Sequence, residues 1–155
     1  MSRVVDVDAV VIGAGMAGAS AAYFLAPHAR VAVLEREAHP GVHATGRSAA
    51  LFSETYGSPQ VRALTRATRP FLQRPPAGFA AHPILAPRGT VIIGDAGKVD
   101  AVEAMHAAMA PHTPGLTLLS PDELLAMVPV LRPEAARIGL HEPGAADIDV
   151  NELHQ

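Results

Sequence analysis

Apolar and polar positions form blocks along the chain that predict a mixed order of strands and helices. Residues 9–12 are an apolar run that ends at a glycine, which is typical of a buried strand. An alanine-rich run after Gly18 predicts a helix that ends near Pro27. Residues 31–34 form a second apolar, β-branched run, and the acid Glu35 follows it directly. The predicted order is therefore strand, glycine turn, helix, strand and acid.

The later part of the chain alternates between predicted helices, strands and connections rich in proline and glycine. Residues 37–47 show no periodicity and predict a loop. The spacing of Val102, Met105 and Met109 places them on one helix face, and we expect them in the core. The further predicted elements are a short helix over 48–56, an amphipathic helix over 58–73, a β-hairpin of 84–86 and 90–93, a helix with a capping box at 100–103, a strand over 116–119, a helix with a capping box at 120–123, a strand over 138–141 and a helix start at 149–152.

Charged and metal-binding residue types form few patterns of their own. Arg62, Arg66 and Arg69 share the polar face of the predicted 58–73 helix, and we expect them to be a solvated surface. His39 and His43 are four residues apart, but a proline and a glycine between them break the helix that would align two metal ligands. We therefore predict no metal site.

Composition narrows the classes of function. The chain has 155 residues, of which 49% are hydrophobic, so it can bury a core. Its formal net charge of −3 gives no electrostatic basis for nucleic-acid binding. The chain has no cysteine, which excludes disulfides, a thiolate nucleophile and iron–sulfur clusters. No apolar run approaches the ~18 residues of a membrane-spanning helix, and we expect no membrane span.

The first residues do not have the pattern of a secretory signal. Arg3 is followed by the acids Asp6 and Asp8, and the apolar run beyond them is too short before the first glycine. We therefore expect a cytoplasmic protein.

The glycine turn after the first strand predicts dinucleotide binding. Gly13 allows a tight exit from the strand, Gly15 lets a pyrophosphate approach the backbone, and Gly18 lets the helix pack closely on the strand. The N–H groups and the positive end of the helix dipole face the phosphates. Glu35 ends the second strand, where a carboxylate accepts hydrogen bonds from both hydroxyls of an adenosine ribose. An acid at this position makes NADP the least favoured dinucleotide.

Together with the loop His43-Ala44-Thr45-Gly46-Arg47-Ser48-Ala49-Ala50, this turn gives the chain a resemblance to the D-amino-acid oxidase family of flavoenzymes. The resemblance continues through the predicted hairpin to the segment 146–149 and covers essentially the whole chain. It implies an α/β fold with a Rossmann-like FAD-binding βαβ unit, followed by part of an α+β substrate domain. It also implies FAD as the cofactor and a small amine or amino acid as the substrate, with hydride transfer from a substrate C–H to the flavin.

The resemblance assigns cofactor contacts to three groups of residues. Gly13, Gly15, Ala17 and Gly18 would contact the FAD pyrophosphate, and Glu35 with Arg36 would contact the adenosine. A turn and the first residues of a helix would lie along the pyrophosphate and the flavin ring, and they comprise Thr45, Gly46, Arg47, Ser48, Ala49 and Ala50. The substrate-binding arginine or tyrosine of such enzymes lies in their C-terminal half, so no catalytic residue is carried over. Glu54 and Tyr56 are noted only because they follow this loop.

We expect three segments: an FAD-binding unit with flavin-contacting helices over 1–73, a partial substrate-type domain over 74–148, and the start of a truncated helix over 149–155. The chain is interpreted as the N-terminal piece of a larger protein, which would need a missing C-terminal half or a partner chain, with a self-contained small domain as the alternative. A truncated, non-catalytic nucleotide-binding fragment is the second hypothesis. An NAD-dependent dehydrogenase is the third, and the 45–50 loop has no evident role in it.

Overall fold

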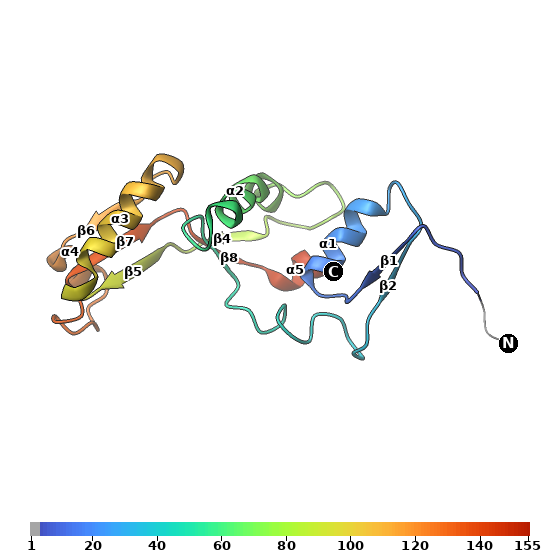
Figure 1. Ribbon diagram of the computed structural model, residues 1–155, viewed down its shortest axis with the longest axis horizontal. Coiled ribbons are helices and arrows are strands. Elements are labelled where there is room, and N and C mark those ends of the chain that lie inside the picture. The colour runs from blue at the N-terminus through green and yellow to red at the C-terminus, as the bar shows by residue number, and fades with distance from the viewer. Residues whose placement is uncertain (1–3) are drawn as a thin grey trace. The chain divides into compact units, whose positions relative to one another are not determined.

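The computed structural model describes residues 4–155, and the chain forms two compact units of mixed α/β structure (Figure 1). The first unit comprises the described residues up to Ala50 together with Val150–Gln155, and the second comprises Leu51–Asp149. Arg3, whose charge entered the expectation of no secretory signal, lies outside the described residues. The boundaries expected after residues 73 and 148 separate an FAD-binding unit from a substrate-type domain, and they stay a prediction.

The first unit contains the predicted strand–helix–strand order. Its elements are β1 (Ala9–Ile12), α1 (Met16–Leu25), β2 (Val31–Leu34) and α5 (Val150–His154). Strands β1 and β2 pair in parallel, from Ala9 opposite Val31 to Ile12 opposite Leu34. Helix α1 packs against both strands, as a right-handed crossover between parallel strands requires. The predicted helix start before residue 150 is also present.

The apolar strands of this unit are less buried than the sequence predicts. Ile12 is 87% exposed and Val10 is 53% exposed, and no residue of α1 is fully buried. The prediction of buried strands is wrong for the described residues, because a two-stranded sheet with one helix packed on it leaves much of its apolar surface uncovered.

The predicted helix over 48–56 is absent. Residues Leu51–Phe52 instead form strand β3, and Ala50 has a positive φ of 51°. Phe52 pairs opposite Ala146 and is buried. The local alanine and serine content favours a helix, but strand pairing and the burial of Phe52 outweigh that propensity.

Two three-stranded antiparallel sheets organise the second unit. The first has the order β3-β8-β4 and the second has the order β5-β7-β6. Helices α3 and α4 pack against the β5-β7-β6 sheet (Figure 1). The remaining elements of the unit are α2 (Pro59–Gln73), β4 (Leu85–Pro87), β5 (Thr90–Gly94), the 3₁₀ turn η1 (Ala96–Lys98), α3 (Val99–Met109), the 3₁₀ turn η2 (Ala110–His112), β6 (Thr117–Leu119), α4 (Pro121–Met127), β7 (Ile138–Glu142) and β8 (Ala146–Ile148).

The predicted β-hairpin of 84–86 and 90–93 is wrong, although both strands exist. Strand β4 pairs with β8 and strand β5 pairs with β7, so the two strands belong to different sheets. The backbone N–H groups of Arg88 and Gly89 both donate to the carbonyl oxygen of Ala145. The proline and glycine that suggested a hairpin turn therefore mark a step from one sheet to the other.

One of the two predicted capping boxes is present. Helix α2 is capped by the Ser58 hydroxyl, and α4 has the predicted capping box of Ser120 and Glu123. The capping box expected at 100–103 is wrong, because η1 precedes α3 and Asp95 caps that turn by accepting a hydrogen bond from the backbone N–H of Gly97.

The core of the second unit lies between α3 and the β5-β7-β6 sheet. Val102 and Met109 are buried there against Leu116, Ile138 and Leu140, and Met105 packs against the same cluster. The predicted apolar stripe on this helix is thus confirmed.

A buried carboxylate joins the two ends of the second unit. Glu142 is 1% exposed and ends β7. Its carboxylate accepts hydrogen bonds from the hydroxyls of Ser53 (2.7 Å) and Thr55 (2.8 Å) and from the backbone N–H of Glu54 (2.7 Å). A buried polar group is tolerated only when its hydrogen bonds are satisfied, and here three donors satisfy it. Glu142 thereby fixes the path of the chain after β3.

We expect Glu142→Ala to destabilise the second unit by about 3 kcal/mol, because it leaves three buried donors without their acceptor. Chemical denaturation followed by circular dichroism measures the free energy of unfolding. Glu134→Ala is the matched control, since that side chain is 70% exposed, and its change should stay within about 0.5 kcal/mol. Equal stabilities of the two variants would contradict the role given to Glu142.

Candidate cofactor-binding site

Three glycines shape the turn between β1 and α1. Gly13 has a φ of +93°, a conformation that glycine adopts without strain, and its N–H donates to the carbonyl oxygen of Leu34 at 2.7 Å. A Cβ added at Gly18 would overlap the carbonyl oxygen of Gly13. A Cβ added at Gly15 would lie 3.3 Å from the Thr45 hydroxyl oxygen. The conformation of the turn therefore leaves little room for a side chain at Gly15 and none at Gly18.

Helix α1 begins directly after this turn, and its N-cap residue has no side chain that could cap it. Gly15 is the N-cap, and no acidic residue lies in the first helical turn. The N–H of Met16 donates to the Thr45 hydroxyl at 2.9 Å. The next N–H groups, those of Ala17 and Gly18, have no acceptor within the helix because they precede its first i to i−4 bond. This end of the helix therefore presents donors and a positive dipole to an anion.

Glu35 lies at the glycine turn. One of its carboxylate oxygens accepts a hydrogen bond from the N–H of Ala14 at 2.7 Å, and the other accepts from Arg36 (2.7 Å) and Glu37 (3.0 Å). The hydrogen bond from the backbone N–H of Glu37 has the largest effect, followed by that from Ala14, and together they hold the pKa of the Glu35 carboxyl below its ordinary value of 4.5. The side chain is therefore an ionised acceptor beside the N-terminus of α1.

His154 is a residue of this site that the sequence did not reveal. Its Nε2 lies 2.7 Å from the carbonyl oxygen of Ala14, and its ring also approaches Gly41. Helix α5 carries it there from 140 residues further along the chain. A single histidine so far from the turn gives no local signal, so sequence reasoning had no means to find it.

The loop from residue 36 to 50 has only part of its expected contacts. Arg36 pairs with Glu37, and its side chain is 87% exposed. The N–H group of Gly46 donates to the carbonyl oxygen of Gly41, and that of Arg47 donates to the carbonyl oxygen of His43, so both bonds stay within the loop. Ser48 caps no helix, because none begins there.

The structure thus brings Gly13, Gly15, Ala17, Gly18, Glu35 and Thr45 together. It gives no side-chain contact to that turn for Arg36, Arg47, Ser48, Ala49 or Ala50 among the interactions that it describes. Whether this second group contacts a cofactor stays a prediction.

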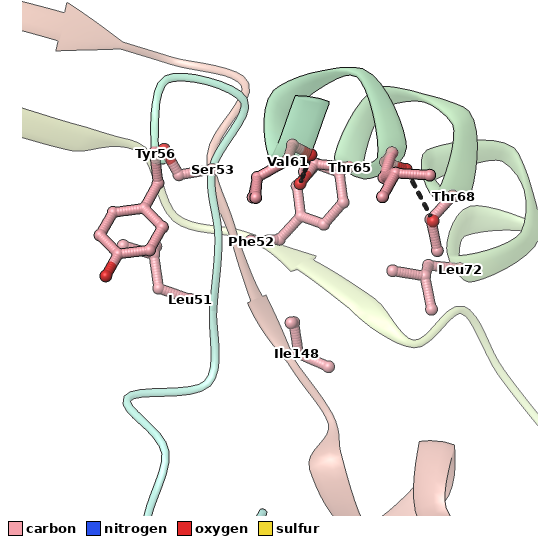
Figure 2. Close-up of a pocket in the computed structure, with 10 residues that line it drawn as sticks. Leu51, Phe52, Ser53, Tyr56, Val61, Thr65, Thr68, Leu72 and Ile148 are labelled. Carbon is pink, nitrogen blue, oxygen red and sulfur yellow. Dashed lines mark hydrogen bonds between the residues drawn. The ribbon is translucent and has the colours of Figure 1, made fainter. Parts of the chain in front are cut away.

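The second unit has an apolar groove of about 320 Å³ between α2 and strands β3 and β8. Figure 2 shows Phe52, Val61 and Thr65 around the same space, with Leu72 and Ile148 nearby. Tyr56 also lines the groove and is 78% exposed. Glu54, which the sequence noted with Tyr56, instead forms an ion pair with Arg69 at 2.6 Å.

We expect NMR titration of the Glu35 side-chain carboxyl to give a pKa below 4.5, whereas an exposed glutamate without these donors should titrate at its ordinary value. A depressed pKa in the folded state means that the stabilisation is present above the ordinary pKa and is lost as the pH falls through the folded-state value. Glu35→Gln should remove this part of the acid dependence of unfolding. A pKa at or above 4.5 would show that the contact with Ala14 is not kept in solution.

No helix among residues 4–155 is long and apolar enough to cross a membrane.

Comparison with known proteins gives a consistent family. The family model for FAD dependent oxidoreductases matches residues 8–155. Glycine oxidase from Bacillus cereus ATCC 14579 is 20% identical with a TM-score of 0.77, and the match covers 96% of this chain and 42% of that chain. FAD-bound L-α-glycerophosphate oxidase from Mycoplasma pneumoniae is 18% identical with a TM-score of 0.79, covering 96% of this chain and 40% of that chain. Iminodiacetate oxidase from Chelativorans sp. BNC1 is 26% identical with a TM-score of 0.68, covering 94% and 42%.

These similarities support the fold over nearly all of this chain, which spans about two fifths of the length of the solved structures. The cofactor of the matching family is FAD, as the sequence resemblance implies. Since the family model covers almost every residue, the chain belongs to the D-amino-acid oxidase family of FAD-dependent oxidoreductases.

Proposed function

We propose that this chain binds FAD at the glycine turn and serves as the FAD-binding part of an oxidoreductase that acts on an amine or amino acid. The observation that carries the proposal is the position of Glu35, whose carboxylate lies 2.7 Å from the N–H of Ala14. An acceptor for a ribose and the donors at a helix N-terminus are thereby placed side by side, as a nucleotide diphosphate requires.

The residues at the turn fit a pyrophosphate. A Cβ built on Gly13 meets nothing within 4 Å, so open space adjoins the turn. The first turn of α1 itself contains no acidic residue. The hydroxyl of Thr45 takes up the N–H of Met16 and leaves those of Ala17 and Gly18 for a ligand.

Each residue group has a distinct proposed role. The N–H groups of Ala17 and Gly18 bind the diphosphate, and the bare backbone at Gly13 and Gly15 lets it approach. Glu35 accepts hydrogen bonds from the adenosine ribose, after giving up its contact with Ala14. Arg36 joins Glu35 at the adenosine. The turn made by Thr45, Gly46, Arg47, Ser48, Ala49 and Ala50 lies along the pyrophosphate and the flavin ring. Bound FAD supplies an acceptor for the hydride of a substrate C–H bond.

The substrate class is proposed from the similar structures. Glycine oxidase, iminodiacetate oxidase and L-proline dehydrogenase are named for amino acids or a related amine. Glycerophosphate oxidase is named for a different substrate. We therefore propose an amine or amino-acid substrate for the whole enzyme, and assign no catalytic residue to this chain.

The alternative proposal is a chain that binds nucleotide without catalysis on its own. The exposure of Ile12 and Val10 favours it, because the sheet that carries the turn is only partly covered in the described residues. A chain that binds FAD but reduces no flavin in the presence of glycine or D-amino acids would support this alternative.

We expect the purified chain to bind FAD, and Glu35→Gln to weaken that binding at least tenfold through loss of a charged acceptor for the ribose hydroxyls. Titration of FAD fluorescence quenching gives the Kd of each variant. Glu134→Gln is the control, since its side chain is 70% exposed and lies in the second unit, and it should bind FAD as the parent chain does. No saturable FAD binding by the parent chain, or equal affinities of the two variants, would overturn the proposal.

A further inference from the structure

The arginine face of α2 differs from the solvated surface that the sequence predicts. Arg62, Arg66 and Arg69 follow one another at spacings of four and three residues and therefore lie on one side of the helix. All three side chains are half-buried in the second unit. Arginines of this kind bury their aliphatic stems along apolar surface and keep their charged head groups accessible.

These arginines line two adjoining hollows. A hollow of about 270 Å³ is lined by Arg62 and Arg66 together with His112 and Thr113. A second hollow of about 390 Å³ is lined by Arg66, Arg69 and the acid Glu54, with the same His112 and Thr113. The two share Arg66, His112 and Thr113 and form one region, which we name the α2 recess.

The charge in the α2 recess is only partly compensated. Arg69 is paired with Glu54 at 2.6 Å and also donates to the carbonyl oxygen of Gly144 at 3.0 Å. Arg62 donates to the carbonyl oxygen of Gly57 at 2.7 Å, a contact that leaves its charge uncompensated. The side chain of Arg66 has neither a hydrogen bond nor an ion pair to any residue that the structure describes.

A buried hydroxyl at the same place is also unsatisfied. Thr113 is 3% exposed, and its hydroxyl oxygen has no hydrogen-bond partner among the described residues. Buried hydroxyls without a partner are uncommon and costly in folded proteins. Glu54 is the carboxylate that lines the recess, and it is paired with Arg69, whereas Glu142 lines neither hollow.

We propose that the α2 recess binds a phosphate group, either as the free anion or as a phosphate monoester. Arg62 and Arg66 supply guanidinium groups, whose planar sets of donors match phosphate oxygens, and His112 adds a ring nitrogen. The site lies wholly in the second unit and does not involve the glycine turn, so it stands independently of the proposed FAD binding.

The test is an ¹H–¹⁵N NMR titration of the full chain with inorganic phosphate at constant ionic strength. We expect saturable shifts of the amide resonances of His112 and Thr113. Arg66→Gln should weaken this binding at least tenfold, because a charge-assisted hydrogen bond contributes that much. Arg132→Gln is the matched control, since its side chain is 83% exposed and lies outside the recess, and it should leave the affinity unchanged.

The titrations distinguish free phosphate from a phosphate monoester, and some outcomes would contradict the proposal. A lower Kd for glycerol 3-phosphate than for inorganic phosphate identifies a monoester as the ligand, and the reverse identifies the free anion. Arg62→Gln gives an independent variant if Arg66→Gln does not fold. Absence of saturable shifts at His112 and Thr113, shifts confined to residues 13–18, or parent-like affinity of both arginine variants would overturn the proposal. FAD titration of the same samples tests the glycine turn separately.

Discussion

The packing of Gly18 against the carbonyl group of Gly13 is the constraint on which the candidate site depends. Only a residue without a Cβ fits there, and the close approach fixes where α1 begins relative to β1. The N–H of Gly13 is then bonded to Leu34, at the end of β2. Because the turn is tied to both strands, the next residue after β2, Glu35, reaches the N–H of Ala14. A donor set and an acceptor are thereby held together before any ligand arrives.

Each unit has a carboxylate that accepts several hydrogen bonds, but in opposite environments. Glu35 is solvent-exposed and accepts hydrogen bonds from the backbone N–H groups of Ala14, Arg36 and Glu37. Glu142 is buried and bonds to Ser53, Glu54 and Thr55, where displacement would leave unsatisfied groups. The same chemical group is therefore accessible to solvent in one unit and a buried anchor in the other.

The sequence predicts well where the determinants are local. The glycine spacing, the parallel pairing of β1 with β2, the capping box at Ser120 and the core stripe on α3 all depend on residues close together in the chain. The failures share long-range causes. Strand β3 forms in place of a helix because Phe52 pairs with Ala146, more than 90 residues away.

The same distinction explains the incomplete prediction of the candidate site. Thr45 was assigned to the cofactor loop, but its bond to the N–H of Met16 depends on how that loop folds back. His154 reaches Ala14 only through the placement of α5. The half-burial of Arg66 likewise comes from tertiary packing around α2, which helical periodicity alone does not describe.

The central claim is that the diphosphate of FAD lies on the N–H groups at the start of α1. Its most direct test follows the backbone amide resonances of Gly15, Ala17 and Gly18 while FAD is added to the ¹⁵N-labelled chain. We predict large, saturable shifts at these three amides, reproduced by ADP and not by riboflavin, which has no phosphate. If FAD binds and the resonances of these three amides do not shift, the result would contradict the account.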